Sequence, residues 1–228
     1  MNIIMDKDLD LTGEKSRKIK QVLNESLGHS IKIINIARDN ILNSLMVISA
    51  TQDRDAELPD DYLAGVIANV WIVIDTIHRL RKLLGYDPEL KKLPAINKFL
   101  DRMPSVKSIR DFVHHIDDNN NGRLEVTRIE LLAEKELPVW GVLSWISSLP
   151  NKPIRIHALI SGTFTNAPLD NPAGKYLEGQ ISNIIFKAFD HEFDFSSAMK
   201  SFDDLVASKV IPTIGSTLYA QLDVEPNK

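Results

Sequence analysis

The stretch IRDFVHHIDDNNNGRLE, residues 109–125, is where the chain changes from a helical to an extended pattern. Before it, apolar residues recur every three or four positions, as in helices that bury one face. Within it, DDNNNG (117–122) combines residues that form poor helices and good turns. After it come runs rich in strand formers. The change predicts an α+β fold, with an N-terminal helical bundle followed by a four-stranded antiparallel sheet and a closing helix.

The expected helices come before this stretch. The first begins at Glu14, and its apolar stripe continues past Gly28, where we expect a break or a bend. The second covers about 61–84 and has a wide apolar face, which predicts a central position in the core. Prolines divide the following region into short helices, the last over about 104–116. The stripe of the first helix comprises Ile19, Val22, Leu23, Leu27, Ile34, Ala37, Ile41, Leu45 and Ile48.

The expected strands follow DDNNNG. They are LEVTRIEL (124–131), WGVLSWIS (140–147), IRIHALISG (154–162) and ISNIIFKAFDHEFDF (181–195). The proline-containing SLPNKP (148–153) suits a hairpin connection, and TNAPLDNPAGK (165–175) is typical of a polar loop. A closing helix capped by Ser196 is expected, with Met199, Phe202, Leu205 and Val206 facing inward.

These patterns suggest a division of the chain. Residues 1–13 are expected to be a disordered tail, 14–118 a helical bundle, and 119–228 the sheet with its C-terminal helix. The second and third parts could share one core. The 228 residues are sufficient for one large domain or two small ones.

The overall composition excludes several kinds of site and partner. The chain has no cysteine, which rules out disulfides, thiolate metal sites and cysteine nucleophiles. Its net charge is −4, whereas non-specific nucleic-acid binders usually have a basic excess. Basic residues cluster within 15–20 and 79–92, and both clusters are typical of solvated helix faces.

The most apolar stretch, AGVIANVWIVIDTIHRL (64–80), contains Asn69 and Asp75 and runs into basic residues. This composition favours a buried helix over a membrane span. The first residues lack the basic start and long apolar run of a signal peptide. We therefore expect a cytoplasmic protein that does not contact membranes.

A short motif lies at the end of the helical part. Arg110 and His115 are separated by four residues, and Asp111 follows the arginine. This string resembles the R-x4–6-H motif of HEPN domains, in which a polar residue often follows the arginine. The resemblance covers about residues 14–118, and the sheet lies outside it.

The HEPN resemblance implies a helical bundle that cleaves RNA without a metal or another cofactor. It also implies a homodimer in which two motifs face each other across a cleft. Many such proteins serve as toxins or defence components, so an antitoxin-type protein is an implied partner. By the resemblance, His115 would be the acid or base, Arg110 the phosphate ligand, and Asp111 the residue that orients one of them.

The side-chain chemistry is consistent with this assignment, but it leaves the histidine open. Imidazole exchanges protons near neutral pH, and a guanidinium group binds phosphate through a planar set of donors. On a regular helix, His114 lies on the same face as Arg110, because the two are four residues apart. His115 lies further round. Either histidine could therefore act.

Two other interpretations of the same stretch remain open. Arginine and histidine interact favourably with a helix C-terminus, so the motif could be structural in a non-catalytic assembly protein. Asp117, Asn119, Asn121 and a following glycine also fit the opening of a calcium-binding loop. However, Arg128 stands where the closing bidentate glutamate belongs, which counts against calcium.

Overall fold

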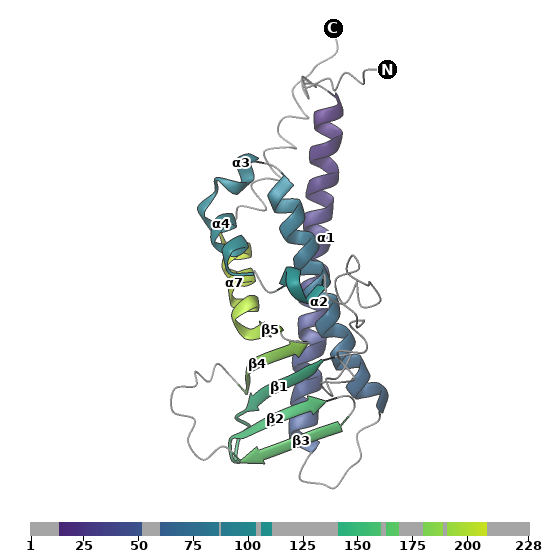
Figure 1. Cartoon of the computed structure of the whole chain (residues 1–228), viewed down its shortest axis with the longest axis vertical. Coiled ribbons are helices and arrows are strands. Elements are labelled where there is room, and N and C mark those ends of the chain that lie inside the picture. Colours follow the sequence, from purple (N-terminus) through teal and green to yellow (C-terminus); the bar gives the residue numbers. More distant parts are fainter. Residues whose placement is uncertain are drawn as a thin grey trace, which may run out of the picture.

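The computed structural model describes the following residues of the chain: 14–51, 60–86, 88–103, 106–110, 141–160, 163–168, 180–188 and 191–208. Two long helices, α1 (Glu14–Thr51) and α2 (Asp60–Tyr86), pack side by side, and α1 runs along most of the molecule (Figure 1). The short helices α3 (Pro88–Lys91) and α4 (Pro94–Asp101) follow, and residues 106–110 are also helical.

The second half of the described chain forms an antiparallel sheet and a helix. Its elements are β1 (Val142–Ser147), β2 (Arg155–Ile160), β3 (Thr163–Pro168), β4 (Ile181–Ala188), β5 (His191–Asp194) and α7 (Phe195–Ala207). The strand order is β3-β2-β1-β4-β5, and every neighbouring pair is antiparallel. The predicted α+β class is therefore confirmed, with helices first and the sheet and closing helix after them.

The sheet differs from the prediction in its strands. The described residues form five strands rather than four, and the expected strand at 124–131 lies outside them. Thr163–Pro168 forms β3, although residues 165–168 were expected to belong to a polar loop. The backbone of this segment pairs with β2, while the side chains of 165–168 stay exposed, so the polar sequence is compatible with a strand. The expected strand 181–195 divides into β4 and β5, which pair as a hairpin, and Phe195 begins α7.

The helices also differ from the prediction in detail. α1 continues through Gly28 without a break, since packing along its length outweighs the helix cost of one glycine. Val22 is 62% exposed, so it does not belong to the buried stripe. Asp194, rather than Ser196, caps α7 by accepting a 2.9 Å hydrogen bond from the backbone N–H of Ser197. The hydroxyl of Ser196 instead accepts a hydrogen bond from the backbone N–H of Ile184.

The buried apolar residues of the helices, the sheet and α7 form one cluster. A polar chain within it joins the sheet to α1. The indole N–H of Trp145 donates to Ser49 of α1 at 3.0 Å, and the indole stacks on His157 with 5.0 Å between ring centroids. Nε2 of His157 lies 2.7 Å from the hydroxyl of Ser147. His157 is thus a hydrogen-bonded packing residue within the core.

The apolar helix α2 packs within the protein. Residues Leu63–Tyr86 are long and apolar enough to cross a membrane by length and composition alone. Half of that apolar window is nevertheless buried by the rest of the chain, as in the central helix of a soluble protein. Its core face comprises Val66, Val70, Val73, Ile77, Leu80 and Leu84, each 0% exposed. The expectation of a buried helix therefore agrees with the fold.

Candidate functional site

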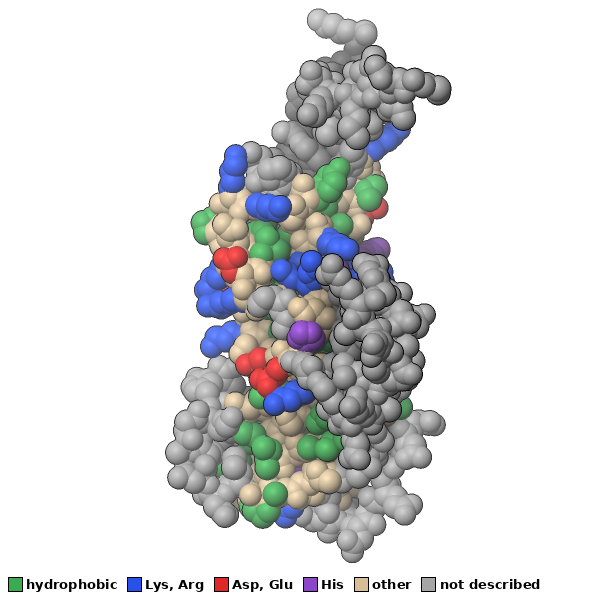
Figure 2. Space-filling model, viewed as in Figure 1, with side chains coloured by type: hydrophobic (Ala, Val, Ile, Leu, Met, Phe, Trp, Pro, Cys, Tyr) green, Lys and Arg blue, Asp and Glu red, His purple; other side chains and the backbone are tan. Residues whose placement is uncertain are grey.

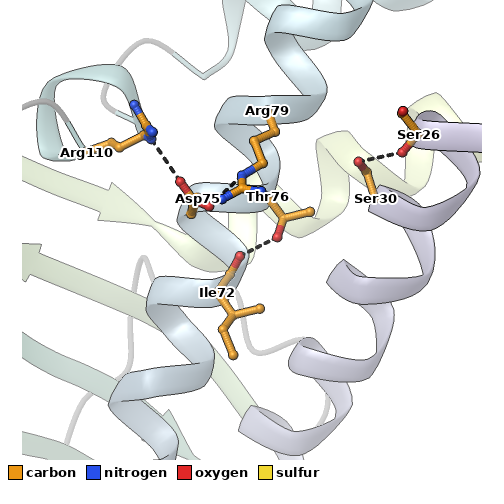
Figure 3. A network of polar contacts seen from close by, with 7 residues as sticks. All are labelled: Ser26, Ser30, Ile72, Asp75, Thr76, Arg79 and Arg110. Carbon is orange, nitrogen blue, oxygen red and sulfur yellow. Dashed lines mark hydrogen bonds and ion pairs between the residues drawn. The ribbon is translucent and has the colours of Figure 1, made fainter. Parts of the chain in front are cut away.

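The side chain of Asp75 lies between two arginines on the side of α2 that faces away from α1 (Figure 3). Nε of Arg110 donates to Oδ1 of Asp75 at 2.9 Å. Nε of Arg79 lies 2.7 Å from the other carboxylate oxygen, Oδ2. Each carboxylate oxygen therefore binds a different guanidinium, and the three charges sum to +1.

The local structure explains why these side chains meet. Asp75 and Arg79 are four residues apart on α2, with the acid N-terminal to the base, which is the favourable order for a helical ion pair. Arg110 comes from the helical segment 106–110, whose Val106 and Ile109 are completely buried. These two anchors hold the segment in the core and place Arg110 opposite Asp75.

The three side chains differ in their exposure to water. Arg110 has 25% of its side chain exposed, Asp75 31% and Arg79 70%. Partial burial raises the pKa of the Asp75 carboxyl, but the hydrogen bonds and charges of Arg110 and Arg79 outweigh it and lower that pKa below its usual value. Asp75 is therefore ionised near neutral pH and holds both arginines in place.

The contact with Asp75 uses only one edge of the Arg110 guanidinium. Its Nε makes the hydrogen bond, while a terminal nitrogen points away from Asp75 (Figure 3). Guanidinium carries five N–H donors in a rigid plane, so the terminal amino groups can bind a second oxyanion such as a phosphate. Asp75 thus orients Arg110 without using all of its donors.

Basic side chains surround this group on the surface. Figure 2 shows lysines and arginines gathered across the face that includes α3, α4 and the middle of α2. The exposed lysines and arginines on or directly next to these elements and on 106–110 are Arg79, Lys82, Lys91, Lys92, Lys98, Arg102 and Lys107. Oδ2 of Asp204 lies 3.5 Å from Nζ of Lys98 and 3.7 Å from Nη1 of Arg102, so this carboxylate offsets part of their positive charge. An acidic chain therefore carries a local basic surface next to Arg110.

One basic residue departs from the expected solvated helix face. Arg81 is partly buried, and burial lowers the pKa of its guanidinium group. The other described members of that cluster, among them Arg79 and Lys82, are exposed as expected.

Most residues of the predicted site lie outside the part of the chain that the structure describes. Arg110 is described, whereas Asp111, His114 and His115 are not. The residues of the possible calcium loop, Asp117, Asn119 and Asn121, also lie outside it. The structure therefore places Arg110 in a polar cluster and leaves the rest of the motif as a prediction.

The acid that holds Arg110 was not predicted. In the sequence, Asp75 is a polar interruption of an apolar helix, and nothing in its spacing pointed to Arg110. The available signal was the charge itself, because an acidic residue within a central apolar helix needs a compensating contact. Arg79, four residues further on, was a local candidate for that contact, but Arg110 was not.

One cavity lies elsewhere in the fold. It has a volume of about 590 Å³ and lies between α1, β4 and α7. Two of its four acidic residues serve the fold: Oδ1 of Asp203 lies 2.7 Å from Nη1 of Arg38, and Asp194 caps α7. Among the described residues, no group of three or more His, Asp or Glu side chains is placed to hold a metal ion. The Arg110 cluster combines a guanidinium held by one edge with further N–H donors, and this chemistry suits an anionic ligand.

Comparisons with protein-family models, with curated proteins and with solved structures found no match to this chain.

Proposed function

We propose that the chain is a metal-independent endoribonuclease of the HEPN type, in which Arg110 binds the phosphate at which RNA is cleaved. The observation that supports the proposal is the orientation of Arg110 by Asp75, beside Arg79 and within a basic surface. An arginine held by its Nε edge presents its terminal amino groups in a fixed direction. That geometry suits two-point binding of a phosphate.

The proposed reaction uses the 2′-hydroxyl of the RNA as its nucleophile. A histidine, His115 or His114, takes the proton of this hydroxyl while the oxygen attacks the adjacent phosphorus. The bond to the 5′-oxygen breaks, and that oxygen takes up a proton as it leaves. The products are a 2′,3′-cyclic phosphate and a free 5′-hydroxyl. Arg110 stabilises the negative charge that builds on the phosphate oxygens, and Asp111 orients the catalytic histidine.

Arg79 extends the proposed phosphate site. It is 70% exposed and shares Asp75 with Arg110, so one phosphate or two neighbouring phosphates could contact both guanidinium groups. The surrounding lysines favour a polyanion over a small neutral ligand. We infer that this surface binds single-stranded or looped RNA, whose phosphates and 2′-hydroxyls are accessible.

The proposed biological role is that of a toxin or defence component in the cytoplasm, controlled by an antitoxin-type protein. In the HEPN type, two copies of the motif face each other across a cleft, so a homodimer belongs to this proposal.

The direct experiment is RNA cleavage in EDTA by the purified chain. Several structured and unstructured RNAs are used, and the cyclic phosphate end is identified by mass spectrometry. We expect Arg110→Ala to lower the rate about 100-fold or more, because it removes a group that stabilises transition-state charge. Separate His114→Ala and His115→Ala variants identify the catalytic histidine, and Asp111→Ala tests the orienting residue.

Lys18→Ala is the matched control, because Lys18 is an exposed basic residue on α1. It should cleave RNA like the wild type. Absence of cleavage by the wild type on all RNAs, or full activity in every motif variant, would remove the enzyme proposal.

One observation favours a second candidate, a non-catalytic assembly protein. Arg110 is only 25% exposed and is ion-paired within its own chain, so it could serve to hold segment 106–110 on α2. In that case Arg110→Ala lowers stability, and neither the wild type nor the variant cleaves RNA. Measuring cleavage and unfolding on the same preparations separates the two functions.

A further inference from the structure

One face of α1 is exposed to solvent although half of its residues are apolar. The apolar members have large exposed fractions: Val22 62%, Ile33 44%, Ile36 64% and Val47 47%. We call this face the α1 seam and define it by eight residues: Val22, Ser26, His29, Ile33, Ile36, Asn40, Asn43 and Val47. The core of the protein does not need these residues, because α1 packs inward through a different stripe that includes Leu27, Ile34 and Ile41.

The spacing of the α1 seam is that of a coiled coil. Its positions follow one another at alternating steps of four and three residues from 22 to 47. This average of 3.5 residues keeps one line of side chains in contact with a second helix. The 25 steps of about 1.5 Å give a contact line about 38 Å long.

The α1 seam has the same pattern when read in either direction. A twofold axis that crosses α1 between residues 34 and 35 places each seam residue opposite another of the same character. Val22 then faces Val47 of a second copy, and Ile33 faces Ile36. Ser26 similarly faces Asn43, and His29 faces Asn40. Apolar residues meet apolar ones and polar residues meet polar ones, as an interface between two identical antiparallel helices requires.

The flank of the α1 seam adds charge complementarity. Lys32 and Asp39 are both exposed and lie on the same side of the seam, one heptad apart. In the antiparallel arrangement, Lys32 of one copy lies next to Asp39 of the other, and the symmetry forms this pair twice. A parallel arrangement places Lys32 opposite the position of Ala37, which is buried and uncharged. The charges therefore favour the antiparallel orientation.

We propose that two copies of this chain dimerise through the α1 seam, antiparallel and about the axis between residues 34 and 35. The exposed Ile72 of α2, 44% exposed, adjoins this surface near the contact between Asn40 and Asn69 and extends it onto the neighbouring helix. The polar His29–Asn40 and Ser26–Asn43 layers set the register. A shift of one heptad would bury them against isoleucine or valine, and a shift of two heptads would bring only half of the seam into contact.

The dimer is independent of the proposed ribonuclease activity. Asp75 and Arg110 lie on the side of α2 that faces away from α1, so the α1 seam does not include them (Figure 3). This dimer leaves the two Arg110 side chains on separate outer surfaces. It does not form the shared cleft of the proposed ribonuclease, so that cleft requires a second, separate contact between copies of the chain.

The first test measures mass in solution by light scattering after size exclusion. The wild type is expected at twice the 25.7 kDa chain mass. Ile33→Glu/Ile36→Glu places charges at the centre of the α1 seam and should raise the dimer dissociation constant about 100-fold or more. The matched control is Ile156→Glu/Ile160→Glu on β2, where both isoleucines are about equally exposed, at 41% and 40%. A wild type that stays monomeric at about 100 µM overturns the proposal, because specific interfaces of standard size have dissociation constants of about 1 µM or lower.

The second test determines orientation and remains informative if the charged variant does not fold. The chain has no cysteine, so any disulfide that forms involves only the introduced cysteines. Val22→Cys/Val47→Cys should form an intermolecular disulfide on mild oxidation, because these positions face each other in the antiparallel dimer. Val22→Cys alone should not. Crosslinking of the single variant with itself indicates a parallel dimer, and crosslinking of neither variant excludes the α1 seam.

The third test exchanges the flanking charges. Lys32→Asp creates two repulsive contacts with Asp39 of the other copy and should weaken the dimer, whereas Lys32→Asp/Asp39→Lys restores opposite charges and should restore it. Equal weakening in the single and double variants contradicts the proposed pair. RNA cleavage measured on the same variants shows whether activity depends on this dimer, so the two proposals can fail separately.

Discussion

Nε of Arg110 donates a 2.9 Å hydrogen bond to Oδ1 of Asp75, and this bond joins the segment 106–110 to the middle of α2. The two residues are 35 positions apart in the chain. Asp75 holds Arg79 by its other oxygen, so a single carboxylate sets the position of two guanidinium groups. Any role of Arg110, in phosphate binding or in structure, therefore depends on Asp75.

The first prediction concerns Asp75. Asp75→Asn removes the negative charge and leaves two arginines facing each other, so the variant should lose about 1–2 kcal/mol of stability at neutral pH. Urea unfolding followed by circular dichroism measures the difference. Asp101→Asn on α4 is the control, since Asp101 is exposed to solvent. Equal stability of wild type and Asp75→Asn would show that the cluster does not stabilise the fold.

The Asp75 contribution should also depend on pH. Its pKa is lowered in the folded state, because Arg110 and Arg79 outweigh the effect of burial. The stabilisation is therefore present above the pKa of the unfolded carboxyl and is lost as the pH falls through the folded one. The stability difference between wild type and Asp75→Asn should accordingly shrink in acid.

The sequence could predict the parts of the fold that depend on apolar periodicity. The buried face of α2 follows from the spacing of Val66, Val70 and Val73, because a helix has to bury such a stripe. Strand β3 could not be predicted in this way. Its described side chains, Thr165 to Pro168, are all exposed. Because β3 is held by backbone pairing with β2, its sequence shows no alternation of apolar and polar residues.

The candidate site was less predictable than the fold, for a related reason. Arg110 was identified by its local motif, but its partner Asp75 lies on another helix, and a tertiary contact of this kind has no fixed spacing. The α1 seam illustrates a different limit. Val22 was placed in the core stripe because one heptad pattern lies beside another on α1, and only the exposed fractions separate them.

The second prediction concerns His157, which is 1% exposed beneath Trp145. Burial, with the nearby Arg155 charge, lowers the pKa of His157 to about 4. Between that pH and about 6.5 the unfolded chain binds a proton that the folded chain does not, so stability falls as the pH drops through this window. The loss is complete below about pH 4 and amounts to roughly 3 kcal/mol at most.

The comparison that isolates this effect is wild type against His157→Gln, which does not titrate. Chemical unfolding between pH 4 and 7 should give a steeper decline for the wild type. The stability difference between the two proteins should therefore narrow or reverse as the pH falls. Parallel curves over the whole window would mean that His157 is not held neutral by the fold.

The third prediction concerns the contact between the sheet and α1. Ser49→Ala removes the acceptor of the Trp145 indole N–H, which is completely buried, and should cost about 1–3 kcal/mol. Ser44→Ala is the matched control, because Ser44 lies on the same helix and is only partly buried. Thermal unfolding followed by circular dichroism measures the effect. An unchanged Ser49→Ala melting temperature would mean that the hydrogen bond adds little to the packing of the indole.

The fourth prediction compares two glycines that should respond to alanine in opposite directions. Gly141, just before β1, has a φ of 89°, and a Cβ there would lie 2.6 Å from Cζ of Phe186 and 2.7 Å from the carbonyl oxygen of Lys187. Gly141→Ala should therefore destabilise the protein by about 2–4 kcal/mol through backbone strain and displacement of a buried ring.

Gly28 lies within α1, and a Cβ there meets no atom within 4 Å. Gly28→Ala should stabilise the protein by about 0.5–1 kcal/mol, because alanine favours the helix. Urea unfolding of both variants measures the two changes, and a shift of the same sign in both would contradict the assigned backbone geometry.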